Sequence, residues 1–243
     1  MKKLTLIKYS YIIFIVLLVS FGNINAQYNG NLFNVSFNAN YTTSARIYLN
    51  PNSSDIDLKN RSNSVSDIFS PSIDIRYALS EDIFLGISTE YMYKVISDYL
   101  NVLGPKGTET INIDDGFKLI PVELFVHYLL PFSTEDFKFL IGGGVAYYYG
   151  SHVRKFGNEE ISNVKRDFAY GVHVSTSADY LINKFLSVRA EMKFRDPEFE
   201  TTNKYNKNIV NYNGEVIKVN QETFDSKINV DGITFTLGIA FEF

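Results

Sequence analysis

The last twelve residues of the chain, 232–243, alternate between apolar residues and small or polar ones. The apolar positions are Ile233, Phe235, Leu237, Ile239, Phe241 and Phe243. A period of two is that of a β-strand with one apolar face. In water such a strand at an open edge would invite aggregation, whereas in a membrane it can close a barrel whose apolar face meets lipid. The pattern therefore predicts a strand of a transmembrane β-barrel.

Seven earlier segments show the same alternation, and each is close to the ~9–11 residues that a tilted membrane strand needs. They are Leu32 to Tyr41, Pro71 to Leu79, Ile83 to Val95, Leu119 to Leu130, Phe137 to Tyr149, Phe168 to Tyr180 and Leu186 to Arg195. With the terminal segment they predict an all-β fold, an eight-stranded antiparallel transmembrane up-and-down β-barrel.

The connections between these segments differ in length. Four are long, at 42–70, 96–118, 150–167 and 196–230, and they alternate with three short ones at 80–82, 131–136 and 181–185. Transmembrane barrels have long extracellular loops and short periplasmic turns, so the alternation supports a membrane barrel. The alternative is a soluble sandwich or lipocalin-like barrel, whose apolar face would point inward.

The beginning of the chain has the layout of a secretory signal peptide. Three lysines precede an apolar run from Tyr11 to Phe21, and a short polar stretch ends at Ala26. We expect residues 1–26 to be cleaved and residues 27–243 to form the barrel domain. The alternative, an uncleaved anchor, is disfavoured because the run is shorter than the ~20 residues that cross a bilayer.

Composition excludes several classes of function. The chain has no Cys, which excludes disulfides, thiolate metal sites and thiol catalysis. Its net charge of −4 becomes −7 once the three lysines of residues 1–26 are removed. An acidic balance gives no support to nucleic-acid binding.

The terminal segment also carries a motif. Residues 236–243, Thr-Leu-Gly-Ile-Ala-Phe-Glu-Phe, resemble the terminal signal of the small outer-membrane β-barrels of the OmpA, OmpX and OmpW type. The resemblance implies the fold, a place in the outer membrane of a Gram-negative-type bacterium, and recognition by the barrel-assembly machinery. It implies that role for Thr236, Gly238, Phe241 and Phe243, and it implies no catalytic residue.

The inward phase of the predicted strands carries many charges. The interior of an eight-stranded barrel is just wide enough for side chains to fill, so opposite charges inside it should pair. We therefore predict a salt-bridge lattice; the alternative is a narrow ion path lined by the same residues. The predicted members are Asp74, Arg76, Glu90, Lys94, Glu123, His127, Lys138, Asp179, Arg189, Glu191, Lys193, Arg195 and Glu242.

Two pairs of residues invite an enzymatic interpretation. His173 and Ser175 resemble the His-x-Ser element of outer-membrane lipid A deacylases, but the alternation turns both side chains inward, away from lipid. Glu123 and His127 share the inward face of one strand, where a metal or acid–base pair is conceivable but lattice membership is the simpler interpretation. We predict no catalytic, cofactor-binding or metal site.

These observations predict a non-enzymatic, monomeric outer-membrane barrel with a structural or surface-interaction role. Its predicted partners are outer-membrane lipid, the assembly machinery and an unknown surface ligand. A hairpin formed by residues 208–212 and 215–219 is expected to protrude from the membrane. The alternatives are an OmpW-like channel or transporter for small or apolar molecules and, third, a lipid A-modifying enzyme.

Overall fold

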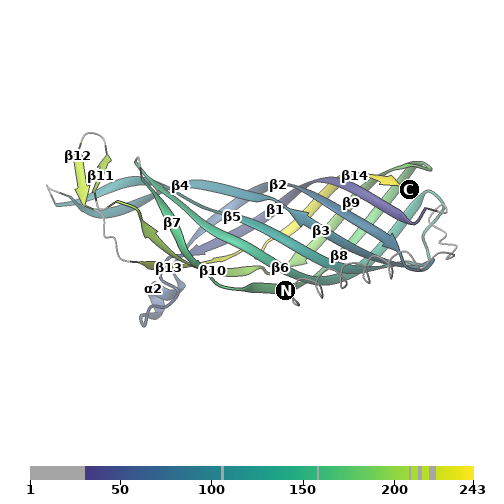
Figure 1. Ribbon diagram of the computed structural model, residues 1–243, viewed down its shortest axis with the longest axis horizontal. Coiled ribbons are helices and arrows are strands. Elements are labelled where there is room, and N and C mark those ends of the chain that lie inside the picture. The colour runs from purple at the N-terminus through teal and green to yellow at the C-terminus, as the bar shows by residue number, and fades with distance from the viewer. Residues whose placement is uncertain (1–30, 105–106, 158, 208, 213–214, 219–222) are drawn as a thin grey trace, which may run out of the picture.

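The computed structural model describes residues 31–104, 107–157, 159–207, 209–212, 215–218 and 223–243. The predicted signal peptide therefore lies outside the described residues. The described chain forms one elongated barrel with a single short helix on its flank (Figure 1). No helix in the described part of the chain is long and apolar enough to cross a membrane.

The elements follow one another almost without irregular segments. In chain order they are β1 (Phe33–Tyr48), α2 (Ile56–Asn60), β2 (Ser62–Ala78), β3 (Ile83–Glu90), β4 (Met92–Gly104), β5 (Gly107–Leu129), β6 (Phe137–Phe156), β7 (Glu159–Arg166), β8 (Ala169–Asn183), β9 (Leu186–Arg195), β10 (Glu198–Tyr205), β11 (Ile209–Tyr212), β12 (Glu215–Lys218), β13 (Phe224–Asn229) and β14 (Ile233–Glu242).

Eight of these strands close into a ring that we call the lower barrel. β1 pairs with β2, then β3, β5, β6, β8, β9 and β14 follow in turn, and β14 pairs back with β1, all antiparallel. The terminal strand closes the ring, with Phe241 opposite Val35 and Ile239 opposite Phe37. The prediction of an eight-stranded antiparallel barrel is confirmed.

Beyond the lower barrel the wall continues as an outer extension. It consists of the far ends of β1, β2, β5 and β6 together with β4, β7, β10 and β13. β13 pairs with both β1 and β10, and β4 lies against β2. The hairpin of β11 and β12, at the far end of the extension in Figure 1, agrees with the predicted hairpin.

The four long connections that were predicted as loops are largely built of β-strands, which form the extension. The sequence did not reveal these strands because their alternation is reversed, with apolar residues facing inward and polar residues facing outward. In β5, Ile111 and Ile113 point inward and the polar Asn112 and Asp114 point outward, the reverse of a lipid-facing strand. A search for outward apolar faces does not detect strands that stand in water with their apolar side chains inside.

One irregularity marks the transition on β1 and β2. Below it the inward residues of β1 are even-numbered, ending at Thr42, whereas above it they are Ala45 and Ile47. On the facing strand Asp67 has a positive φ of 55°. The register of β1 and β2 is the same on both sides of this point, with Thr42 opposite Ile68 and Ser44 opposite Ser66, so the change of facing occurs in both strands without an inserted residue. It turns Ala45 and Ile47 into the interior of the extension.

Glycines bring β6 close to β5. A Cβ atom added at Gly144 would lie 1.9 Å from the carbonyl oxygen of Leu124, and one added at Gly142 would lie 2.0 Å from that of Val126. Neither contact is possible for a larger residue without moving the backbone. The run of three glycines at 142–144 is therefore a packing feature within a strand.

Candidate functional site

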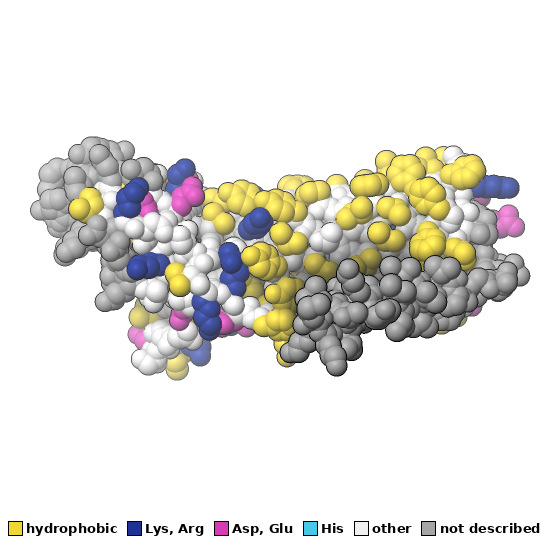
Figure 2. Space-filling view, viewed as in Figure 1, with side chains coloured by type: hydrophobic (Ala, Val, Ile, Leu, Met, Phe, Trp, Pro, Cys, Tyr) yellow, Lys and Arg dark blue, Asp and Glu magenta, His cyan; other side chains and the backbone are white. Residues whose placement is uncertain are grey.

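The outer face of the lower barrel is a continuous apolar belt. Outward residues such as Phe37, Leu124, Val145 and Leu237 are all about half exposed or more, and polar residues take their place on the extension (Figure 2). An apolar patch of this size on a protein surface indicates contact with a non-aqueous phase. Together with the closed barrel, it indicates that the lower barrel spans a membrane.

Arg189 is the centre of the first half of the interior network. Its guanidinium donates to Asp74 and to Asp179, each at 2.8 Å. It also donates to Asn34 and Ser36, each at 3.0 Å. These partners come from three strands besides its own, so one buried side chain ties together residues more than 100 positions apart.

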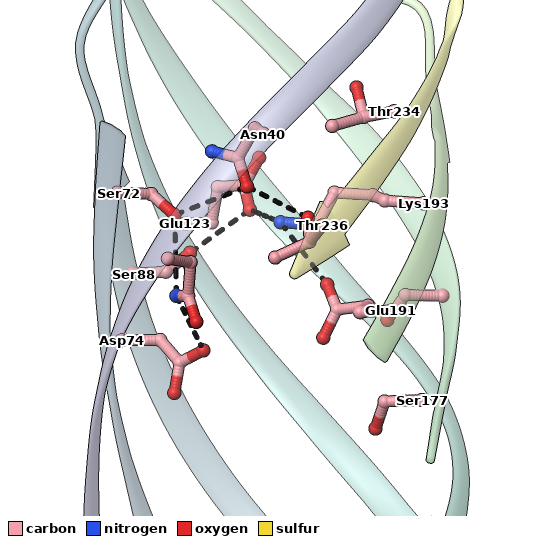
Figure 3. A network of polar contacts seen from close by, with 12 residues as sticks. Asn40, Ser72, Asp74, Ser88, Glu123, Ser177, Glu191, Lys193, Thr234 and Thr236 are labelled. Atoms are coloured by element: carbon pink, nitrogen blue, oxygen red, sulfur yellow. Dashed lines mark hydrogen bonds and ion pairs between the residues drawn. The ribbon is translucent and has the colours of Figure 1, made fainter. Parts of the chain in front are cut away.

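Arg195 is the centre of the second half, nearer to the extension. It donates to Glu90 at 2.6 Å and to Glu123 at 3.0 Å. Lys193 also reaches Glu123, at 2.6 Å, and Arg76 reaches Glu191 at 2.8 Å. Figure 3 shows residues of this network pointing from the surrounding strands into the lumen. Paired and hydrogen-bonded charges are the form in which a narrow, dry interior tolerates ionised groups.

The remaining space is small. The hollow lined by Asn38, Glu123, His127 and their neighbours has a volume of about 20 Å³. That volume holds roughly one water molecule.

The other predicted lattice residues are placed differently. Glu242 accepts from Asn34 and Ser187, and Lys138 is buried nearer the short turns. Lys94 lies outside the network: it belongs to β4, and its Nζ donates to the carbonyl oxygen of Asp67 at 3.0 Å. Its predicted place in the lattice was therefore wrong, because β4 continues along β5 into the extension and carries Lys94 beyond the height of the network.

An apolar layer covers the network on the side of the extension. It includes Met92, Phe117, Leu119, Tyr148 and Phe199, each almost completely buried. The inward positions thus change from polar in the lower barrel to apolar in the extension, while the outward positions change the other way. Each half places its apolar side chains away from water.

A second polar cluster lies beyond this layer, inside the extension. Asp115 accepts from His152 at 2.7 Å and from Arg154 at 2.8 and 3.0 Å. The other ring nitrogen of His152 is 2.9 Å from the hydroxyl of Ser226. Sequence reasoning missed these residues because it placed them in loops. The inward phase of β5, which carries Asp115 between Ile113 and Phe117, is the signal that could have found them.

Burial and hydrogen bonding set the charges of this cluster. Burial alone would raise the pKa of Asp115, but the hydrogen bonds from His152 and Arg154 hold that pKa well below its usual value. Burial lowers the pKa of His152, against the opposing pull of Asp115. At neutral pH the Asp115 carboxylate is therefore paired with the Arg154 guanidinium and accepts a hydrogen bond from the neutral imidazole of His152.

The residues considered for catalysis are placed inside the lower barrel. His173 and Ser175 are both buried, and the Ser175 hydroxyl lies 2.7 Å from Nε2 of His127. Glu123 bonds to Ser88, Lys193 and Arg195. Among the described residues no group of three or more His, Cys, Asp or Glu side chains is placed to hold a metal ion.

The residues of the terminal motif lie on the strand that closes the ring. Phe241 and Phe243 face outward, whereas Thr236 and Gly238 face inward. The backbone of Phe243 exchanges hydrogen bonds with Phe33, at 2.7 and 3.0 Å. Recognition of this strand by the assembly machinery stays a prediction.

Comparison with known proteins bears on the fold. No protein-family model matches the chain, and no curated protein does either. The outer membrane protein OprG of Pseudomonas aeruginosa is similar, with a TM-score of 0.53, 14% identity, and coverage of 91% of this chain and 99% of OprG.

Two other solved structures align over a similar extent. Neisserial surface protein A does so with a TM-score of 0.47, 14% identity, and coverage of 87% of this chain and 97% of its own. Ail of Yersinia pestis does so with a TM-score of 0.47, 10% identity, and coverage of 88% of this chain and 99% of Ail. The chain thus has the fold of the small outer-membrane β-barrels.

Proposed function

We propose that the chain is a non-enzymatic outer-membrane β-barrel that is closed to the flow of solutes and acts through its outer extension. The observation that carries the proposal is the double filling of the interior, by an ion-pair network and by the apolar layer above it. Flow along the axis would require both to open. A filled lumen favours a structural or surface role over transport.

The extension supports the second half of the proposal. It is a walled structure with its own apolar core, which includes Ile111, Phe156 and Tyr205 and is completed by Val210 and Ile217 of the hairpin. A rigid body standing in water can hold a constant surface toward a partner at little cost in entropy. The interaction surface we propose is therefore the outer wall and tip of the extension, and its partner is a macromolecule outside the cell.

Single-channel recording tests the closed interior. Residues 27–243 would be refolded, shown to be folded by the heat-dependent shift on a gel, and inserted into a planar bilayer. We expect no steady conductance, because removing the seal means breaking buried ion pairs that cost several kcal/mol each to separate. A reproducible conductance from folded protein would contradict the proposal and make transport the leading function.

A further inference from the structure

One face of the barrel carries an apolar groove with a notch at its outer end, and two cations lie near that end. The groove has a volume of about 520 Å³ and lies across β3, β5, β6 and the start of β8. One wall of the groove is aromatic and is formed by Tyr147, Phe168 and Tyr170. The centre of the Phe168 ring lies 5.0 Å from that of Tyr147 and 5.7 Å from that of Tyr170. The floor of the groove is aliphatic and includes Val122 and Val145. The size difference between the two sets of side chains makes the hollow.

A smaller notch continues the groove outward. It has a volume of about 150 Å³, shares Tyr147 and Phe168 with the groove, and is also lined by Tyr149, Gly150 and Arg166. The register of the strands places them in rows. Val122, Tyr147 and Tyr170 are paired neighbours in one row, and one pleat further out Ile120 faces Tyr149.

The notch lies where the sheet divides. β6 pairs with β8 up to Tyr148 and with β7 only from Lys155 onward, so the ladder lapses between these residues. The side-chain amide of Asn163 bridges part of the gap, with hydrogen bonds of 3.0 Å to both the backbone N–H and the carbonyl of His152.

Two cations lie near the outer end of the groove: Arg166 lines the notch, and Lys118 is on the neighbouring strand β5. Lys118 faces Ser151 across the ladder, and Arg166 donates to the hydroxyl of Ser151 at 3.0 Å. Nζ of Lys118 lies 5.1 Å from the centre of the Tyr91 ring, and the guanidinium carbon of Arg166 lies 5.2 Å from that of Tyr149. Within the described residues neither cation forms an ion pair with a carboxylate. The nearby Asp167 is paired with Lys165 at 2.7 Å.

We propose that the groove and notch bind an anionic phosphorylated lipid of the outer leaflet. The acyl chain lies in the groove, and Lys118 and Arg166 bind the phosphate. A lipid fits this position because the groove opens within the lipid-facing belt. The two cations lie against aromatic rings at the outer edge of the belt, which is the depth of the lipid headgroups. The inference rests on the membrane placement in the proposed function, but not on the closed interior.

Native mass spectrometry of the folded chain tests the site, with diphosphoryl lipid A as the probe and phosphatidylcholine as the zwitterionic comparison. The charge variant is Lys118→Gln with Arg166→Gln, and its matched control is Lys59→Gln with Arg61→Gln on and beside the exposed helix α2. A third variant, Val145→Phe, fills the groove without changing charge.

We expect the charge variant to bind lipid A about tenfold more weakly or worse, since each Lys or Arg near a membrane surface contributes ~1 kcal/mol. Its binding of phosphatidylcholine should be unchanged, Val145→Phe should weaken both lipids, and the control should match the wild type. Lipid A binding within twofold of wild type in either site variant, or an equal loss in the control, would overturn the proposal. The gel shift shows separately whether each variant is folded, and channel recording tests the closed interior independently.

Discussion

Replacing Arg189 by Met is expected to lower the free energy of unfolding by about 3–5 kcal/mol, the range for breaking a buried ion pair by removing one partner. The side chain is 1% exposed and bonds to two carboxylates, Asp74 and Asp179. Methionine fills part of the volume but leaves both acids without this cation. The measurement is urea unfolding of the refolded protein in lipid vesicles, followed by circular dichroism because the chain has no Trp.

Two further variants separate charge from volume. Arg46→Met removes a pair with Asp231 whose side chains are 47% and 25% exposed, so we expect little change in stability, because solvent screens an exposed ion pair. Adding Asp179→Leu to Arg189→Met should recover part of the loss, because it removes one of the abandoned charges. If Arg189→Met were no more destabilising than Arg46→Met, the interior network would not hold the barrel together.

Replacing Phe117 by Ala should cost about 3–5 kcal/mol, the usual range for a buried phenylalanine in a core. Phe117 is fully buried in the apolar layer between the two polar clusters. Its loss leaves a cavity beside buried ion pairs and weakens the extension first, because lipid does not support that part of the wall. Protease susceptibility of the extension, measured alongside urea unfolding, should rise.

Two control substitutions show whether the loss of stability in Phe117→Ala comes from the loss of buried apolar volume. Phe117→Leu retains most of the apolar volume and should cost less than half as much. Tyr99→Ala removes an aromatic residue of β4 that is 70% exposed, and should change stability by no more than ~0.5 kcal/mol. A Phe117→Ala protein as stable and as protease-resistant as Tyr99→Ala would mean that the extension has no cooperative core.

The lower barrel could be predicted from sequence because lipid imposes a simple rule on every strand. Alternation of apolar and polar residues assigned Phe37, Ile239 and their neighbours to the outside, and Asp74 and Arg189 to the inside. The extension could not be predicted in the same way. There the apolar side chains face inward, and Asp115 and Arg154 interrupt the pattern with polar residues at buried positions.

The sequence also could not predict which residues of the interior network pair with each other. A period of two gives the face on which a side chain lies, but not its height in the barrel, which depends on strand tilt and stagger. The contact between Arg189 and Asp74, 115 positions apart, depends on that stagger. The lapse of pairing along β6 that forms the notch is likewise a product of tertiary structure, since nothing in the alternation of residues 137–156 marks it.

The placement of the membrane is the central claim, and single-cysteine labelling tests it most directly, because the chain has no native Cys. Leu237→Cys lies in the belt and Val164→Cys on the outer wall of β7, and the native residues are similarly exposed, at 63% and 60%. With a fluorophore on each in vesicles, we expect brominated lipid to quench the label at 237 and aqueous iodide to quench the label at 164. Quenching of the label at 164 by lipid, or of the label at 237 by iodide, would contradict the account.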